Sequence, residues 1–339
     1  EPQGTNLVTY SEDFSDSSWT KQNITLSQNA STSPKGTLTA ELVYPTTTGT
    51  NRRIIKGVSG ASGDIFTLSI FVKSAGFRWV YFPVLATGSS ADDAWFDIID
   101  GVVGTIGGNA VNYNIERYKD GWFKICVSGA SDGTNNFIIS PVDDNNTKLS
   151  TTNGTDGIFV WGAQSEESSV ATSYIPTNGS TVTRLADVVG GAGDVNTFNS
   201  SEGVLYAEIA ALSNDLTSRE ITINNGTTSR YVMMRYDNSS NRITCFLNNG
   251  SVQGGFSFIS SDIKNLNKVA YVYGTTFKLF VNGVKIGEST GTTFSGGTLN
   301  NLSFARGNST SFSFFGKCKD LQYYNTALTD AELTELTTL

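Results

Sequence analysis

The chain has 339 residues and a formal net charge of −8, which suits about two domains with an acidic surface. No run of basic residues is longer than Arg52–Arg53, whereas nucleic acids and anionic membrane surfaces require concentrated positive charge. We therefore expect no nucleic-acid partner, and neutral partners rich in hydroxyl groups, such as polysaccharides, remain open. Histidine is absent, which removes the commonest general base and metal ligand.

The composition is typical of an all-β protein. Aromatic residues make up 11% and charged residues only 16%, with 35 glycines for turns. Cys126, Cys245 and Cys318 are an odd set without CxxC spacing, so we expect free thiols and folding in a reducing cytoplasm. The chain starts at Glu1, which suggests processing or a fragment. No stretch reaches the ~18 apolar residues of a membrane helix, so no membrane insertion is expected.

Short strand patterns follow one another through the first half of the chain, at 65–76, 77–84, 94–106, 121–129, 137–142 and 157–164. Such strands, separated by Gly, Asn and Asp turns, predict a jelly-roll β-sandwich over residues 1–185. Within 77–84, alternation places Phe77, Trp79 and Tyr81 on one face, while the aliphatic-rich opposite face is expected to be core.

Residues 178–197 are poor in aromatic residues and rich in glycine, which favours a linker. Strand patterns then resume, with hairpin turns predicted at 238–241 and at Asn282–Gly283, the latter of type I′. Near the C-terminus, Thr329 and Glu332 have the spacing of a capping box before a short helix. Residues 198–339 are therefore expected to form a second sandwich that ends in this helix.

Five motifs of residues 5–187 carry a family resemblance: "NLVTYSEDFSDSSW", "FTLSIFVKSAG", "WFDIIDGVVG", "DGWFKICVSG" and "VWGAQSEESSVATSYIPTNGSTVTRLAD". This region resembles the carbohydrate-binding-like jelly-roll module of bacteriophage head-fibre, tail-fibre and spike proteins. Ser165 stands where that family usually has Leu, and Leu185 where it has Ala. The resemblance implies a virion protein, and a homotrimer.

The second half carries "KLFVNGVKIGES", "LSFARGNST" and the closing "FFGKCKDLQYYNTALTDAELTEL". These stretches resemble a concanavalin A-like (laminin-G-like) lectin domain. The two resemblances together imply a fibre or appendage protein whose domains contact host-surface glycans.

Catalysis is not expected. Glycoside hydrolases on the lectin-like sandwich use a Glu-x-Asp-x-x-Glu run that supplies two carboxylates on one strand face. The chain has no such run, and without histidine it lacks a Ser-His-Asp triad. We therefore predict no catalytic residues and no enzyme activity.

Aromatic side chains beside carboxylates are the candidates for glycan binding. In the first domain these are Trp79, Tyr81, Trp95, Asp92 and Asp93. The Trp79/Tyr81 face is open to three interpretations: a glycan platform, a subunit interface or a second packing layer of the sandwich. In the second domain Arg230, Tyr231, Arg235 and Tyr236, together with the rim Arg306-Gly307-Asn308, are further candidates for a binding face.

A calcium ion is a possible ligand, though no cofactor is required. The stretch "PVDDNNTK" offers Asp143, Asp144, Asn145 and Asn146 as oxygen ligands. The alternative is a polar hairpin loop, in which Asp and Asn serve the turn geometry.

The sequence thus favours a non-catalytic virion appendage that adheres to host-surface polysaccharide, located on the virion surface after assembly in the bacterial cytoplasm. The first alternative is a structural or capsid-decorating protein whose modules bind other virion proteins. A secreted bacterial adhesin is the third interpretation.

Overall fold

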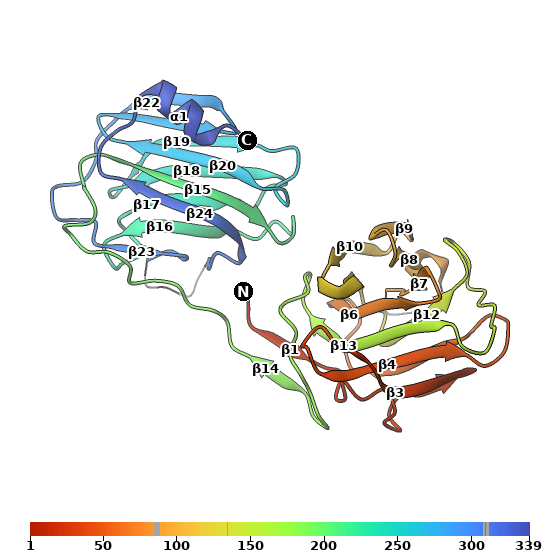
Figure 1. Ribbon diagram of the computed structural model, residues 1–339. Helices are drawn as coiled ribbons and strands as arrows, with labels where there is room; N and C mark the ends of the chain where they lie inside the picture. Colours follow the sequence, from red (N-terminus) through yellow and green to blue (C-terminus); the bar gives the residue numbers. More distant parts are fainter. Residues whose placement is uncertain (85–88, 134, 308, 310–311) are drawn as a thin grey trace. The chain divides into compact units, whose positions relative to one another are not determined.

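The computed structural model describes residues 1–84, 89–133, 135–307, 309 and 312–339. The chain divides into two compact units, Pro2–Ala186 and Asp187–Leu339, with Glu1 belonging to the second (Figure 1). Both units are built from antiparallel β-sheets, so the all-β prediction is confirmed. In the described part of the chain, no helix has the length and apolar character needed to cross a membrane.

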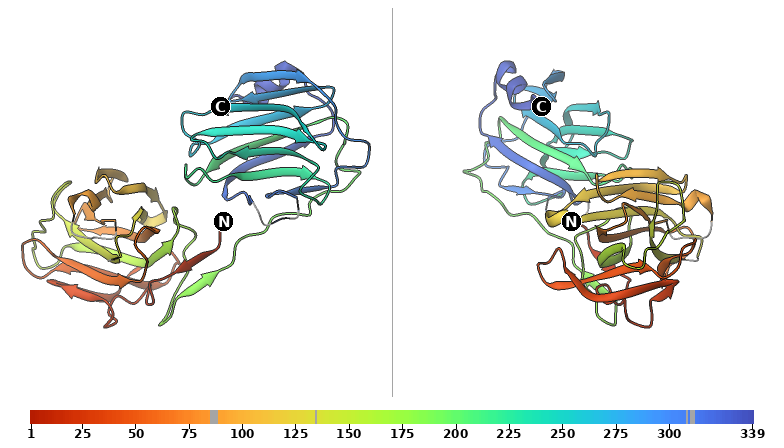
Figure 2. Two further views of the ribbon diagram at one scale, coloured as in Figure 1. Left: turned by 180° about the vertical axis from the view of Figure 1, so that it is seen from behind. Right: turned by 45° about the vertical axis from the view of Figure 1, so that its right-hand side comes forward.

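The first unit is a sandwich of two sheets with the strand orders β10-β11-β6-β13-β4-β3 and β2-β5-β12-β7-β8-β9, and β1 pairs with β14 beside them (Figures 1 and 2). The strand bounds are β1 (Gly4–Asn6), β2 (Thr20–Gln22), β3 (Ile24–Thr32), β4 (Leu38–Pro45), β5 (Arg53–Val58), β6 (Ile65–Ala75), β7 (Trp79–Tyr81), β8 (Ala94–Asp97), β9 (Val102–Ile106), β10 (Ala110–Arg117), β11 (Phe123–Ala130), β12 (Asn135–Val142), β13 (Gly157–Glu167) and β14 (Val182–Arg184). Two short 3₁₀ turns, Ser90–Asp92 and Lys119–Gly121, connect neighbouring strands.

The core of this unit follows from alternation along its strands. On β6 the side chains of Phe66, Leu68, Ile70 and Val72 are fully buried between the sheets, as the sequence pattern predicts. Phe77 also enters this core, which corrects its assignment to the Trp79/Tyr81 face. The reason is that Phe77 and Arg78 lie in the connection between β6 and β7, outside both strands, so the alternation of β7 does not extend back to Phe77.

The closing segment of the first unit packs on the outer face of one sheet. Tyr174 lies against Phe71 and Trp161, with ring centroids 6.3 and 4.6 Å away. Trp161 and Trp122 are buried in this outer cluster. The hydroxyl groups of Tyr174 and Ser11 are 2.6 Å apart. The stretch after β13 therefore runs back against the sandwich and joins the N-terminal loop.

The second unit is a sandwich of two sheets with the orders β22-β21-β20-β15-β24 and β19-β18-β17-β16-β23 (Figure 2). Its elements are β15 (Gly203–Ala211), β16 (Arg219–Asn224), β17 (Tyr231–Tyr236), β18 (Arg242–Asn248), β19 (Val252–Ile259), β20 (Asn267–Tyr273), β21 (Thr276–Val281), β22 (Val284–Thr290), β23 (Asn301–Ser303), β24 (Gly316–Tyr324) and the helix α1 (Asp330–Thr337).

The local signals of the second half are confirmed. Strands β21 and β22 pair around Asn282 and Gly283, whose φ angles of 50° and 80° both have the sign that a type I′ turn requires. Thr329 caps α1, and its side chain and that of Glu332 form the reciprocal capping box. Leu333 anchors the helix in an apolar cluster on the outer face of the sheet that contains β20.

Candidate functional site

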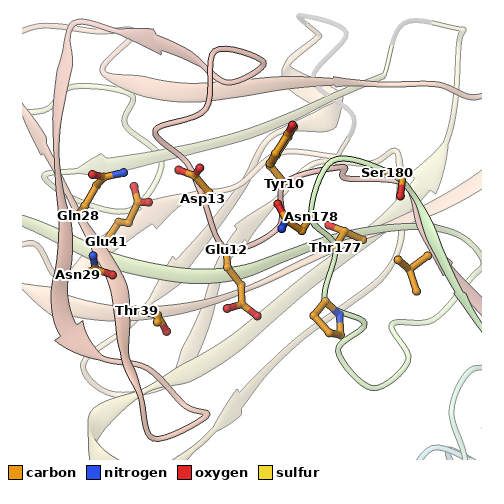
Figure 3. A pocket seen from close by; sticks show the side chains of 12 residues that line it. Tyr10, Glu12, Asp13, Gln28, Asn29, Thr39, Glu41, Thr177, Asn178 and Ser180 are labelled. Atoms are coloured by element: carbon orange, nitrogen blue, oxygen red, sulfur yellow. The ribbon is translucent and has the colours of Figure 1, made fainter.

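An irregularity in the edge hairpin of β3 and β4 shapes one end of the first unit. Three residues of β3, Gln28–Ala30, lie opposite a single residue of β4, Glu41. Asn29 adopts φ +51°, a left-handed conformation that asparagine tolerates better than most residues. Such a bulge redirects side chains out of the regular ladder. It brings the amides of Gln28 and Asn29 to the rim of a cleft that also contains Glu41 (Figure 3).

This cleft has a volume of about 690 Å³ and lies wholly within the first unit. Strands β3 and β4, the N-terminal loop and the segment after β13 supply its lining: Tyr10, Glu12, Asp13, Gln28, Asn29, Thr39, Glu41, Pro176, Thr177, Asn178, Ser180 and Val182 (Figure 3). Residues from the two ends of the unit's sequence thus share one site.

Hydrogen bonds hold the two loop walls of the cleft together. The amide of Ser11 donates to Thr177 Oγ1 at 3.1 Å, and the amide of Thr177 donates to Ser11 Oγ at 2.9 Å. The amide of Gly179 donates to the carbonyl of Thr9 at 2.6 Å. These hydrogen bonds fix the segment 176–180 beside the N-terminal loop. Contacts within the protein therefore hold both walls of the cleft in place.

Glu41 is the most unusual group in the cleft. It shares a strand face with the core residue Val43 and is only 3% exposed. Its Oε1 accepts a hydrogen bond from the amide of Phe14 at 3.2 Å, whereas its buried Oε2 has no hydrogen-bond partner. Burial, together with the negative charge of Asp13, raises the pKa of Glu41 to about 7, against smaller lowering effects of the Phe14 amide, Lys21 and the Ser15 amide.

The lining groups suit a ligand rich in hydroxyl groups. Carboxylates accept hydrogen bonds, while the amides of Gln28, Asn29 and Asn178 both donate and accept. Tyr10 adds an aromatic ring. None of the lining residues is a Lys or an Arg, so the cleft is acidic.

The aromatic face that the sequence suggested as a glycan platform is mostly covered. Trp79, Tyr81 and Trp95 do come together, with Ile138 and Val142, on the outward face of their sheet. However, Tyr81 is 7% and Trp95 only 3% exposed, and Trp79 is half-buried. A ring that stacks on a sugar needs an open face, which Tyr81 and Trp95 lack.

The loop between β12 and β13 covers these rings. The indole of Trp95 donates to the carbonyl of Thr147 at 2.6 Å. Lys148 lies 2.8 Å from Asp93 Oδ1 and 5.0 Å from the centroid of the Tyr81 ring, and the Tyr81 hydroxyl also donates to Asp93, at 2.6 Å. Trp95, Tyr81 and Asp93 therefore hold the loop to the sheet, which corrects the expectation that they face a ligand.

Asp92 has a structural contact as well. It is buried and accepts a hydrogen bond from Asn109 Nδ2 at 2.8 Å. Both carboxylates beside Trp95 thus lie beneath the surface, and their position supports packing and not sugar binding.

The proposed calcium loop forms a polar turn. Asp143 accepts hydrogen bonds from the amide and the hydroxyl of Thr151, each at 2.7 Å. Asp144 accepts from the amide of Asn145 at 2.7 Å, and Asn146 has φ +58°. Within the described ranges, no group of three or more His, Cys, Asp or Glu side chains is placed to hold a metal ion. The contacts are those of the hairpin loop that the sequence offered as the alternative.

The candidates of the second unit lie on the outward face of the sheet that contains β17. Arg235 lies 3.2 Å from Asp237 and 3.7 Å from Glu220, so it belongs to an ion-pair network. Tyr231 is buried, while Arg230 is exposed. Tyr236 points into the core instead, which corrects its inclusion.

The rim residue Arg306 is also engaged. Its Nε lies 2.9 Å from Glu220 Oε2, and its guanidinium stacks 4.1 Å from the ring centroid of Phe312. Asn308 lies outside the described residues. Of the second unit's candidates, Arg230 alone is exposed and makes no ion pair with another described residue, and it does not line the cleft.

Sequence reasoning missed the cleft. Its one local signal is the "SQNAS" interruption of alternation in β3, which marks a possible bulge but does not show that Tyr10 and Asn178 lie near it. The bridge between Tyr10 and Asn178 joins residues from opposite ends of the unit.

Comparison with known proteins places the second unit in a fold class. Residues 194–334 match the model of the concanavalin A-like lectin/glucanases superfamily, a laminin-G-type family. The second unit is therefore a concanavalin A-like domain, as its sequence resemblance predicts. This family match covers less than half of the chain. A search of curated proteins found none that matches the chain.

Several solved structures are similar to parts of the chain. The CBM40 module of the Ruminococcus gnavus IT-sialidase is 18% identical, with a TM-score of 0.38, over 45% of this chain and 96% of that one. Domain 4 of AbnA, an arabinanase of Geobacillus stearothermophilus, is 14% identical, with a TM-score of 0.35, over 48% of this chain and 74% of that one. Domains LG4-5 of the mouse laminin α1 chain are 9% identical, with a TM-score of 0.30, over 78% and 83%.

Proposed function

We propose that this chain is a non-catalytic glycan-binding protein and that the cleft of the first unit is its binding site. The observation that carries this proposal is the buried Glu41, whose Oε2 lacks a hydrogen-bond partner within a cleft lined by amides, hydroxyls and Tyr10. A buried carboxylate oxygen without a partner is costly, and a bound hydroxyl or amino group would satisfy it. The match of residues 194–334 to a lectin and glucanase superfamily supports the same class of function.

The biological setting in our proposal is a virion appendage that adheres to host-surface polysaccharide. The support is the sequence resemblance of residues 5–187 to phage fibre modules. A homotrimer, contacts with other virion proteins and a virion-surface location belong to the same proposal. Multivalency in a trimer would turn modest single-site affinities into firm adhesion.

A structural or capsid-decorating role is the second candidate, and one surface favours it. Ile99, Val102, Val111 and Tyr113, around the edge strands β9 and β10, are exposed. Exposed apolar side chains on neighbouring edge strands are the kind of surface that a subunit contact covers.

Sedimentation of the purified chain tests the proposed homotrimer, because it separates a trimer from a monomer. A monomer at micromolar concentration would contradict the trimer.

A glycan array tests the binding proposal. We expect the wild-type chain to bind a subset of glycans, and both Tyr10→Ala and Gln28→Ala to lose most of that signal. Tyr118→Ala is the matched control, because it removes an exposed tyrosine that does not line the cleft. Loss of binding in Trp79→Ala with full binding in the cleft variants would move the site to the outer aromatic face.

The non-catalytic part of the proposal has its own test. Incubation of the chain with every glycan that it binds is expected to release no new reducing ends. Release that disappears in Glu41→Gln would show that the cleft is an active site.

A further inference from the structure

The charge of the cleft restricts what it can bind. Glu12, Asp13 and Glu41 all line it, and no lining residue is basic. Lys21 lowers the pKa of Glu41 only slightly, and its Nζ donates to the carbonyls of Ser15 and Asp16 at 2.7 and 2.6 Å, while Lys56 Nζ donates to Ser18 Oγ. A sugar that carries a carboxylate would therefore meet a lining whose charged side chains are all negative.

The three carboxylates of the cleft differ in the hydrogen bonds that they accept from the protein. Glu12 Oε1 accepts from the Tyr174 hydroxyl at 3.1 Å, and Asp13 Oδ1 accepts from the amide of Ser15 at 3.0 Å. Glu41 keeps its Oε2 unpartnered although it is the most buried of the three. Of the three residues, Glu41 therefore combines a place in the cleft lining with a buried acceptor oxygen that has no hydrogen-bond partner.

Building on the proposed function, we infer that the cleft binds a glycan with a free, protonated amino group, whose ammonium donates to Glu41 Oε2 while the rim amides bind the sugar hydroxyls. An ammonium group has three donors, so it can also reach Glu12 or Asp13. Charge-assisted hydrogen bonds of this kind are about twice as strong as neutral ones.

Other ligands fit these contacts less well. A neutral hydroxyl would satisfy Oε2 but would leave the negative charges of the neighbouring Glu12 and Asp13 uncompensated. Three carboxylates also attract metal ions, but in the described part of the chain no group of three or more suitable side chains is placed to hold one.

Binding of an ammonium group beside Glu41 should release a proton from the protein. Burial and Asp13 raise the pKa of Glu41 to about 7, so the free protein at pH 6 carries a proton there. An ammonium beside Oε2 favours the ionised carboxylate and expels that proton, whereas a neutral sugar does not.

Calorimetry at pH 6 tests this with the full chain. The probes are the β-1,4-linked tetramer of glucosamine, its fully N-acetylated counterpart, sialyllactose as an acidic glycan and tetralysine as an amine without a sugar. We expect the amino form to bind at least about tenfold more tightly than the acetylated form. Repeating the titration in buffers of different ionisation enthalpy should show roughly one proton released per ammonium-bearing ligand bound.

Two variants complete the design. Glu41→Gln should lose both the preference for the amino form and the proton release, while its folded state is checked by circular dichroism. Glu116→Gln, the same change at an exposed position on β10, should behave as the wild type.

The outcomes are distinguishable. Equal binding of the amino and acetylated tetramers would overturn this inference and leave glycan binding intact. Binding of tetralysine as tight as that of the amino sugar would overturn it as well, because amine recognition would not need a glycan. A chain that binds no glycan on a broad array would overturn the proposed function itself.

Discussion

At the scale of single residues, Glu41 makes the stability of the first unit depend on pH. Its pKa is raised from 4.5 to about 7 in the folded state. Between pH 4.5 and about pH 7, Glu41 is therefore protonated in the folded chain and ionised in the unfolded chain. The resulting stabilisation is complete below about pH 4.5 and disappears as the pH rises through about 7. The full shift corresponds to about 3 kcal/mol, which screening in an open cleft reduces to about 1–2 kcal/mol.

We therefore predict that Glu41→Gln gains stability relative to the wild type as the pH rises. The difference in unfolding free energy between the two chains should shift by about 1–2 kcal/mol in favour of the variant from pH 4.5 to pH 8, because Gln does not titrate. Urea unfolding at several pH values measures it. Glu116→Gln provides the baseline, and the same pH dependence in both variants would show that Glu41 is not the cause.

A second prediction concerns Trp95, which packs beneath the loop between β12 and β13. Trp95→Ala removes a large buried ring and its hydrogen bond to Thr147, so it should destabilise the first unit by about 3–5 kcal/mol. Thermal or urea unfolding measures this. A stable variant that no longer binds glycans would instead support the platform that the sequence suggested.

At the scale of elements, the sequence is most informative where structure is local. The type I′ turn at Asn282–Gly283 and the capped helix α1 depend on neighbouring residues, and both occur as predicted. Alternation also predicted the shared face of Trp79 and Tyr81, whereas Trp95 joins them through the pairing of β7 with β8. The loop that covers these rings was not predictable, because the contact of Trp95 with Thr147 spans 52 residues.

The cleft illustrates the same limit. The bulge opposite Glu41 depends on pairing between β3 and β4, and its other wall comes from residues 176–182. No local pattern indicates which distant segment will close a bulge. Alternation along β4 predicts that Glu41 lies beside the core. It does not predict that Oε2 of Glu41 lacks a hydrogen-bond partner.

Helix α1 gives an element-scale prediction. Thr329→Ala removes the cap that accepts from the Glu332 amide and should cost the second unit about 1 kcal/mol. Thr326→Ala, an exposed threonine just before the helix, is the control. The measurement is the unfolding free energy of the second unit, and equal losses in the two variants would contradict the role of the cap.

At the scale of the whole molecule, each unit has its own core. One core lies between the sheets of the first unit and a separate one between those of the second. We therefore predict two unfolding transitions, with Trp95→Ala shifting one and Thr329→Ala shifting the other. Differential scanning calorimetry distinguishes this from a single cooperative transition that both variants shift equally.

The central claim is that the cleft of the first unit binds a glycan, and mapping of backbone amide shifts by NMR tests it most directly. The ligand is the tightest binder from the array, added to saturation. Our account predicts that the largest shifts occur at Gln28, Asn29, Thr177 and Asn178, with few changes in the second unit. Shifts confined to the second unit around Arg230 and Arg235, or to the surface at Trp79, would contradict it.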